Sequence, residues 1–289
     1  MKYFEFGQQN ETLMVLLHGG GVCYRGVLPV AERLSKDFPV LVVAYDGFNP
    51  TEPDTEFVSV MDEAKRLGDY IVEQHGGKID ILYALSYGCR VLLEVLANER
   101  LTITTTIADG MSTHDYPNIK SKLGKEIYLF FFTGFFYQMM GKAGPMRKKL
   151  IARLTGRRPE EAERLLYPDA TWQSWKNQDS CLIGRPMNFE VFKNTDMHIW
   201  HGINSQVERK LAKDIKKWQD AGHAFTYKVF YNVGHGGLIA ERTEQFIEEV
   251  KAVHAVSQEK KASDVYNRFR LSGADGQHID PHENSGRRL

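Results

Sequence analysis

Short apolar segments alternate with helix-like segments along most of this chain, and this alternation restricts the folds that the chain can adopt. Most of the apolar segments are continuously apolar, which is typical of strands buried on both faces of a parallel sheet. Parallel strands joined by helices form right-handed crossovers, so the sequence predicts an α/β fold with a doubly wound, mostly parallel sheet. The predicted strands cover residues 12–17, 40–45, 79–85, 101–108, 197–200 and 225–231.

Helical spacing of apolar residues predicts the segments that connect these strands. The clearest example is 55–75, where apolar residues recur at steps of three and four between a cap at Asp54 or Thr55 and a stop at Gly76 and Gly77. Further patterns predict helices at 27–37, 88–98, 206–221 and 238–256.

The alternation stops between residues 111 and 195, where only helical patterns remain. Helices are expected at 119–142, 145–155, from Pro159 onward and at 169–181. We therefore predict a core formed by residues 1–110 and 196–256, with an all-helical insertion at 111–195. Residues 257–289 are polar and without periodicity, so a disordered tail is expected there.

Charge and cysteine content exclude several classes of protein. The 37 Lys and Arg residues balance 37 Asp and Glu residues, so no net positive field attracts nucleic acid. Cys23, Cys89 and Cys181 are odd in number and form no CxxC pair, which predicts neither a disulfide framework nor a metal site. No signal peptide is evident, and the longest apolar stretch, 127–140, is too short to cross a bilayer. We expect a cytoplasmic protein without a cofactor.

A lone serine lies where one predicted strand becomes a helix, in ILYALSYGCR at 81–90. A sharp turn at that point exposes its central residue at the carboxyl edge of the sheet, and it needs small residues two positions to either side. Ala84 and Gly88 meet this need around Ser86. Ser86 therefore fits a nucleophile, although the pentapeptide alone fits a helix N-cap equally well.

Two glycine-rich segments after other predicted strands favour the nucleophile. His18-Gly19-Gly20-Gly21 follows the first of the buried strands, and its backbone N–H groups can point at a negatively charged oxygen. The phosphate-binding patterns GxGxxG and GxxxxGK[ST] are absent from this loop. His235 lies between glycines after the last strand and before the last helix, where an imidazole can reach the same edge of the sheet.

Together these motifs resemble the α/β-hydrolase superfamily. The resemblance implies that Ser86 is the nucleophile and His235 the general base, with the backbone N–H groups of Gly20 or Gly21 and of Tyr87 as the oxyanion hole. It also implies that the helical insertion is a cap over the active site, following the sixth strand. The matching segments are LLHGGG at 16–21, AYDG at 44–47, ALSYGC at 84–89, IADGM at 107–111, IWHG at 199–202 and NVGHGGL at 232–238.

The sequence departs from the family pattern at the acid that orients the base. The usual aspartate after the seventh strand would fall at Ser205. Asn204, Glu208 or Asp109 could take its role. We expect Asp109, because it ends a strand at the edge where side chains converge on the site, with Glu208 as the second choice. Asp109 followed by Gly110 also fits a simple turn.

A serine nucleophile predicts acyl transfer to water rather than the chemistry of dehalogenases and epoxide hydrolases, which need a carboxylate. The expected substrate is a small apolar carboxylic ester or a monoacylglycerol. A thioesterase, an amidase or a carbon–carbon hydrolase would use the same residues, and a ligand-binding or receptor-like homologue would account for Ser205. Aromatic and methionine side chains of the insertion line a pocket, contact an interface or pack the cap on the core: Phe130, Phe131, Phe132, Phe135, Phe136, Tyr137, Met139 and Met140.

Overall fold

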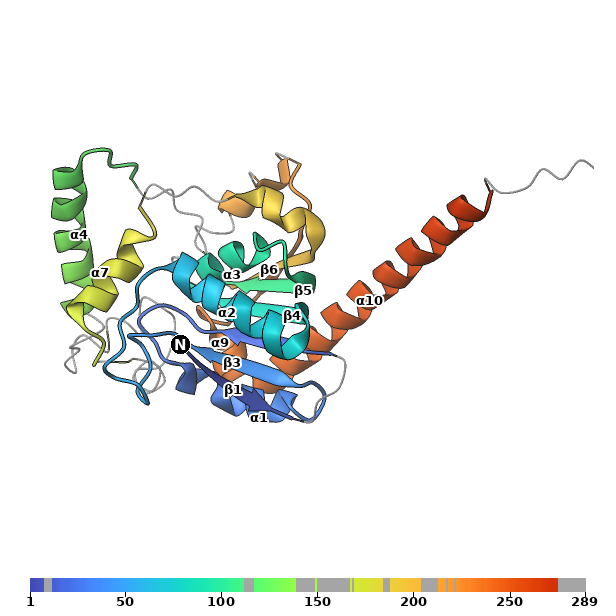
Figure 1. Cartoon of the computed structure of the whole chain (residues 1–289), viewed down its shortest axis with the longest axis horizontal. Coiled ribbons are helices and arrows are strands. Elements are labelled where there is room, and N and C mark those ends of the chain that lie inside the picture. The colour runs from blue at the N-terminus through green and yellow to red at the C-terminus, as the bar shows by residue number, and fades with distance from the viewer. Residues whose placement is uncertain are drawn as a thin grey trace, which may run out of the picture.

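A seven-stranded sheet forms the centre of the structure (Figure 1). The computed structural model describes residues 1–7, 12–111, 117–138, 149, 167, 169–183, 188–203, 213–216, 218–220 and 222–274. The strands lie in the order β1-β3-β2-β4-β5-β6-β7. Their bounds are β1 (Lys2–Phe6), β2 (Met14–Leu17), β3 (Val40–Ala44), β4 (Lys78–Leu85), β5 (Thr102–Asp109), β6 (Asp196–Gly202) and β7 (Thr226–Phe230).

All neighbouring strands are parallel except the pair β1 and β3. The structure confirms the doubly wound, mostly parallel sheet and each of the six predicted strands. Strand β1 was missed because it is a short edge strand with partly exposed side chains, among them Lys2 and Glu5, so it lacks a continuous apolar run.

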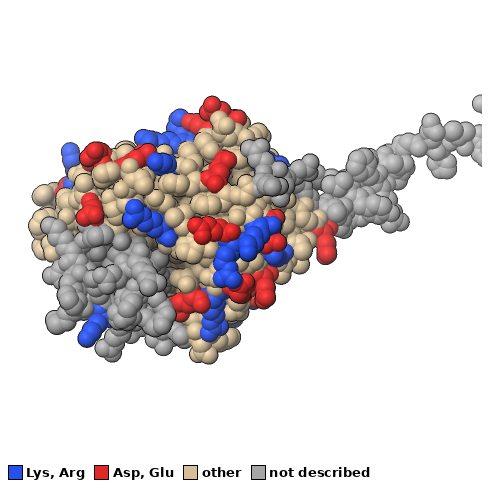
Figure 2. Space-filling view, turned by 90° about the horizontal axis from the view of Figure 1, so that it is seen from below, with Lys and Arg blue, Asp and Glu red and all other residues tan. Residues whose placement is uncertain are grey.

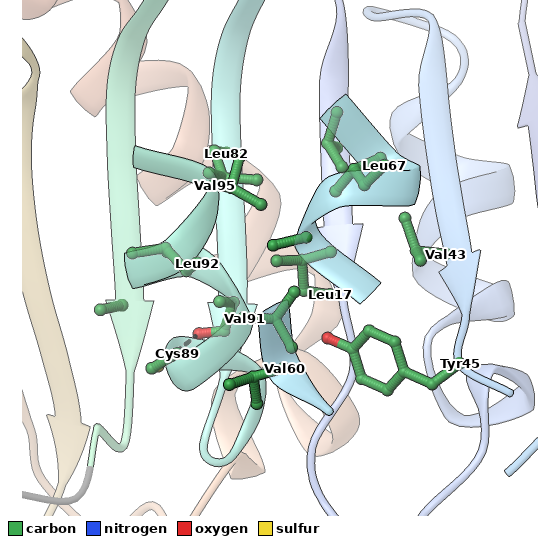
Figure 3. Packing of buried hydrophobic residues seen from close by; sticks show 14 of the residues in the cluster. Leu17, Val43, Tyr45, Val60, Leu67, Leu82, Cys89, Val91, Leu92 and Val95 are labelled. Carbon is green, nitrogen blue, oxygen red and sulfur yellow. Dashed lines mark hydrogen bonds between the residues drawn. The ribbon is translucent and has the colours of Figure 1, made fainter. Parts of the chain in front are cut away.

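Helices cover both faces of the sheet. On one face lie α2 (Val60–His75) and α3 (Gly88–Leu96), which enclose one apolar cluster with strand residues such as Leu17 and Leu82 (Figure 3). On the other face lie α1 (Leu28–Leu34), α9 (Gly237–Glu241) and the first part of α10 (Thr243–Ala274). Neighbouring strand residues alternate between the two clusters, which explains why these strands are apolar throughout.

The carboxyl ends of the parallel strands gather at one edge of the sheet. Leu17 at the end of β2 lies beside Ala84 of β4, and Leu85 at the end of β4 pairs with Asp109 at the end of β5. Gly202 ends β6 opposite Phe230 of β7. Every loop that carries a predicted site residue therefore leaves the sheet at this edge.

The described part of the segment between β5 and β6 contains helices and connecting turns but no strand. It contains α4 (Lys122–Phe136), α7 (Trp172–Ser180) and the 3-10 helix η3 (Phe189–Asn194). The resemblance implied an insertion after the sixth strand, whereas in chain order it follows the fifth strand, β5. Among the described residues only two strands, β1 and β2, precede α1. The predicted helix at 145–155, apart from Lys149, and the one beginning at Pro159 lie outside the described residues.

Two predictions near the carboxyl end were wrong in detail. The predicted helix 238–256 is divided at Arg242 into α9 and α10. Helix α10 then continues past residue 257 to Ala274, where a disordered tail was expected, and it projects from the body in Figure 1. Apolar periodicity reports the part of a helix that packs on the core, whereas polar residues such as Glu259 and Lys260 extend a helix without an apolar stripe, through helix propensity and, at Lys260, an ion pair with Asp196.

The surface agrees with the balanced composition. Basic and acidic side chains are interspersed on the face shown in Figure 2, without a large patch of one sign. Among the described helices, none is both long and apolar enough to cross a membrane. Cys23, Cys89 and Cys181 are buried, and none of the three takes part in a disulfide bond.

Candidate active site

Ser86 occupies the turn between β4 and α3 in a strained backbone conformation. Its φ of 54° lies in the left-handed region, which residues with a side chain rarely adopt. Its N–H donates to the carbonyl of Asp109 at 2.7 Å, which fixes the turn against β5. Helix α3 has Tyr87 as its N-cap and no side-chain capping hydrogen bond, so the N-cap interpretation of Ser86 was wrong.

Close approach of the glycine loop explains the small residue after the turn. A Cβ atom at Gly88 would lie 2.6 Å from the carbonyl oxygen of His18 and 3.0 Å from that of Leu17. A Cβ atom at Gly19 would lie 3.5 Å from the Cβ of Ser86. The loop after β2 therefore lies against the turn that carries Ser86, which accounts for the glycine at position 88.

The predicted oxyanion donors lie together. A Cβ atom at Gly20 would lie 2.9 Å from the Cβ of Tyr87, so the two residues are in contact. Within the described part of the chain, the backbone N–H groups of Gly20, Gly21 and Tyr87 donate no hydrogen bond. Gly21 has a φ of 64°, and a Cβ there would lie 2.2 Å from the ring of Trp175. Only glycine fits at this position.

His18 holds the glycine loop in place. Its Nδ1 lies 2.9 Å from the carbonyl of Gly19, and its Nε2 accepts the N–H of Tyr45 at 3.4 Å. Complete burial lowers the pKa of His18 to about 4, although the hydrogen bond with the Gly19 carbonyl opposes this shift. The imidazole is therefore neutral at physiological pH, with its proton on Nδ1. Both ring nitrogens of His18 are thus engaged with backbone groups, which assigns this histidine to holding the loop rather than to proton transfer.

Asp109 ends β5 with its side chain buried, 2% exposed. Its Oδ2 accepts a hydrogen bond from the hydroxyl of Tyr83 at 2.8 Å. Tyr83 belongs to the apolar cluster beneath α9 and α10, so the carboxylate of Asp109 lies on that face of the sheet. The loop that carries His235 leads into α9 on the same face.

His235 is half-buried in the loop that precedes α9. This loop packs against the end of β6, because a Cβ at Gly202 would lie 2.2 Å from the carbonyl oxygen of Val233. Strand β6 in turn pairs with β5. Directly after β5, the N–H of Gly110 donates to the carbonyl of Trp200 in β6 at 2.8 Å. Ser86, Asp109 and His235 thus belong to three successive positions along one edge of the sheet.

The other positions considered for the third member of the triad are not described: Asn204, Ser205 and Glu208 lie outside the described residues. Asp46, a further aspartate after a buried strand, is bound by the guanidinium of Arg66 at 2.6 Å and by the α-amino group of Met1.

Sequence reasoning missed the side chains that α7 places against the glycine loop. The ring of Trp175 covers Gly21, and Oε1 of Gln178 would lie 2.9 Å from a Cβ at Gly20. The hydroxyl of Tyr87 donates to the main-chain carbonyl of Gln178 at 2.8 Å. No motif marks these residues, because their position depends on how the insertion packs on the core.

The described residues contain no cluster of three or more side chains suited to a metal ion.

Two hollows of the described surface lie along α4. One has a volume of about 660 Å³ and is bordered by apolar residues that include Phe131 and Phe135. The other, about 320 Å³, lies between Phe130, Trp172 and Lys176. Neither hollow is lined by Ser86 or the glycine loop.

Comparison with known proteins gives one match by sequence and several by structure. The model of the alpha/beta hydrolase family matches residues 14–249. No curated protein matches the chain.

Three solved structures illustrate the similarity of fold. MenH from S. aureus has 16% identity and a TM-score of 0.65, with 89% of this chain and 98% of that chain covered. A thermophilic esterase from Thermogutta terrifontis has 17% identity and a TM-score of 0.63, covering 88% and 93%. The Cif epoxide hydrolase from Acinetobacter nosocomialis has 18% identity and a TM-score of 0.60, covering 86% and 84%. At these identities the similarity concerns the fold.

Proposed function

We propose that this chain, which belongs to the alpha/beta hydrolase family, is a serine hydrolase that cleaves carboxylic esters through an acyl-enzyme intermediate. The observation that carries the proposal is Ser86 itself, held at a φ of 54° on a strand-to-helix turn with the glycine loop against its side chain. Such strain costs roughly 1–3 kcal/mol and is typical of functional sites. A turn residue with only a structural role would favour glycine there.

In the first half of the proposed reaction, Oγ of Ser86 attacks the carbonyl carbon of the ester while His235 accepts the hydroxyl proton. A bond forms between Oγ and carbon, and the carbonyl electron pair moves onto oxygen. The N–H groups of Gly20 or Gly21 and of Tyr87 bind the resulting oxyanion. Collapse of this intermediate breaks the bond to the alcohol, which leaves with the proton from His235.

In the second half, water takes the place of the alcohol. His235 accepts a proton from water as the oxygen attacks the acyl carbon, and the same N–H groups bind the second oxyanion. Collapse releases the carboxylic acid and returns the proton to Oγ of Ser86. The carboxylate of Asp109 is proposed to orient His235 and to stabilise its charged form, which fits its burial on the face covered by α9.

An apolar ester is the substrate class that the cap favours. Five apolar side chains on one side of α4 are exposed, which is unusual for a monomer surface and is typical of a contact surface. A substrate aggregated in a lipid phase would cover them. These residues, with their exposed fractions, are Leu123 (71%), Ile127 (50%), Phe130 (64%), Phe131 (70%) and Phe135 (58%).

The fold is compatible with other chemistry, since its structural relatives include an esterase and an epoxide hydrolase by name. Epoxide opening through a covalent ester needs a carboxylate nucleophile, whereas this chain has a serine at the turn. A thioester, an amide or a carbon–carbon bond would be cleaved by the same residues. A binding protein without turnover is the alternative from another class.

Steady-state hydrolysis of p-nitrophenyl esters of increasing acyl length tests the proposal. We expect turnover by the wild-type protein and a loss on the order of 10⁴-fold or more in kcat for Ser86→Ala and for His235→Ala. Ser35→Ala, on the surface after α1, is the matched control and is expected to retain full activity. Full activity of Ser86→Ala would refute the serine mechanism. Absence of turnover by the wild-type protein with every ester would favour the binding protein.

A further inference from the structure

We propose that the side-chain amide of Gln178 donates a hydrogen bond to the oxyanion, so that the cap helix α7 supplies part of the catalytic machinery. This inference rests on the proposed serine hydrolase function and adds to it a residue outside the core motifs. The backbone donors of the oxyanion hole come from the core, whereas Gln178 comes from the insertion. The cap would then complete the site as well as cover it.

The first argument is position. A Cβ atom built at Gly20 would lie 2.9 Å from Oε1 of Gln178. The same atom would lie 2.9 Å from the Cβ of Tyr87. Gly20 and Tyr87 are the residues whose N–H groups form the proposed oxyanion hole. Gly20 directly follows Gly19, and Tyr87 directly follows Ser86. A Cβ at Gly19 would lie 3.5 Å from the Cβ of Ser86, so these two preceding residues are also in contact. The side-chain amide of Gln178 therefore lies beside the proposed oxyanion hole, with Oε1 toward Gly20, and a half-turn about the last side-chain bond exchanges Oε1 for the donor Nε2.

The second argument is the state of the amide. The Gln178 side chain is 2% exposed, yet its Nε2 has no hydrogen-bond partner among the described residues. A buried donor without a partner costs about 1–3 kcal/mol, so native proteins contain few of them. Such a group is explained if its partner is a substrate oxygen.

The third argument is that α7 does not need this amide for its own attachment. The N–H of Phe57 donates to Oγ of Ser174 at 3.2 Å, and Nδ2 of Asn177 donates to the carbonyl of Phe57 at 2.8 Å. Tyr87 binds the main chain of Gln178 rather than its side chain. The helix is thus anchored through other groups, and the side-chain amide of Gln178 is not among them.

The test compares Gln178→Met with Gln173→Met by p-nitrophenyl ester hydrolysis and thermal unfolding. Methionine keeps the length of glutamine and removes the N–H donors. Gln173 lies on the same helix, is exposed, and bonds only Asn177 among the described residues, which makes it the matched control. For Gln178→Met we expect kcat to fall by about 10²-fold with little change in KM, as when other oxyanion donors are removed. We expect the melting temperature to be unchanged or raised, because the variant no longer buries an unpartnered amide.

A second variant provides a signature that a structural role would not produce. Glutamate at position 178 has no donor when ionised, but its protonated form carries an O–H. Burial raises the pKa of such a carboxyl group, so the ratio of kcat for Gln178→Glu to kcat for Gln178→Met is expected to increase as the pH falls from about 8 to about 6. A ratio that is constant with pH would contradict the proposal.

The outcomes separate this inference from the proposed function. If the wild-type protein hydrolyses esters and Gln178→Met retains its kcat, the inference is wrong while the function stands. A lower kcat accompanied by a lower melting temperature would assign Gln178 to packing and also refute the inference. If wild type and the Gln173→Met control both lack turnover, the proposed function itself fails.

Discussion

At the scale of single residues, the site depends on a few close approaches that the fold enforces. Ser86 keeps its strained φ because its N–H is bound to the carbonyl of Asp109 and because Gly88 lets the glycine loop pass at van der Waals distance. The sequence predicted Ser86, Gly20, Gly21, Tyr87 and His235 at this edge because each follows a buried strand. Gln178 could not be predicted, since no local pattern records which side chain of an inserted helix meets the loop.

Asp109→Asn is expected to lower kcat on the order of 10²- to 10⁴-fold, because a neutral amide neither fixes the tautomer of His235 nor stabilises its charged form. The measurement is ester hydrolysis at saturating substrate. Asp80→Asn is the matched control, since Asp80 is also a buried carboxylate of the sheet but lies near the amino end of β4, where it accepts the N–H of Leu13. Full activity of Asp109→Asn would reject this acid, and Glu208→Gln would then be the variant to assay.

Asp179 allows a prediction about pH and stability. Burial raises its pKa to about 7, with the Thr133 hydroxyl opposing the shift. The folded state therefore keeps a proton on Asp179 that the unfolded chain releases near pH 4, so this group lowers stability as the pH rises from about 4 to about 7. Relative to wild type, Asp179→Asn is expected to gain stability over this range, by at most about 1.4 kcal/mol per pH unit, and to level off above it.

Urea unfolding at several pH values measures this difference. Asp169→Asn, which changes an exposed carboxylate just before α7, serves as the control and is expected to show no such trend. His18 acts in the opposite sense, since its folded pKa of about 4 makes the protein less stable as the pH falls below about 6.5. Subtracting the wild-type curve removes that contribution. A constant difference between Asp179→Asn and wild type would contradict the raised pKa.

At the scale of secondary-structure elements, buried and exposed segments differed in how well the sequence predicted them. Strands β2 to β6 were predicted because nearly all of their side chains are buried, so their sequences carry little polar alternation. Strand β7 was predicted too, although it lies at the edge of the sheet with Thr226 and Lys228 exposed. Strand β1 lacks a continuous apolar run and the sequence after residue 257 lacks apolar periodicity, so neither was predicted. Helix α4 was predicted from its apolar run, but which side of it meets α7 is set by tertiary contacts such as Tyr137 with Trp172.

The exposed side of α4 leads to a prediction about presentation of the substrate. Phe131→Ser combined with Phe135→Ser is expected to reduce hydrolysis of a long-chain ester in lipid vesicles by about tenfold or more, since each phenylalanine that enters a lipid phase contributes about 1.5–3 kcal/mol. Hydrolysis of a soluble short-chain ester should not change. Tyr231→Ser removes an aromatic side chain that is 70% exposed elsewhere and is the control. Equal losses with both substrates would assign these phenylalanines to the fold of the cap.

At the scale of the whole molecule, one geometric fact connects fold and site. Parallel strands direct their carboxyl ends to the same edge, so residues as far apart in sequence as Gly20, Ser86, Asp109 and His235 all lie on segments that leave the sheet at this edge. The fold class could be predicted from the sequence, and with it the edge of the sheet at which these segments begin. The contribution of the cap could not, because it depends on the packing of an insertion whose helices carry no catalytic motif.

The most direct test of the account is covalent labelling with a fluorophosphonate, followed by identification of the modified peptide by mass spectrometry. Phosphonylation requires an activated serine, so the account predicts one adduct, on Ser86, in the wild-type protein. The adduct should be absent from Ser86→Ala and strongly reduced in His235→Ala, while Ser35→Ala is labelled like wild type. An unlabelled wild-type protein, or an adduct on any other residue, would contradict the central claim that Ser86 is an activated nucleophile.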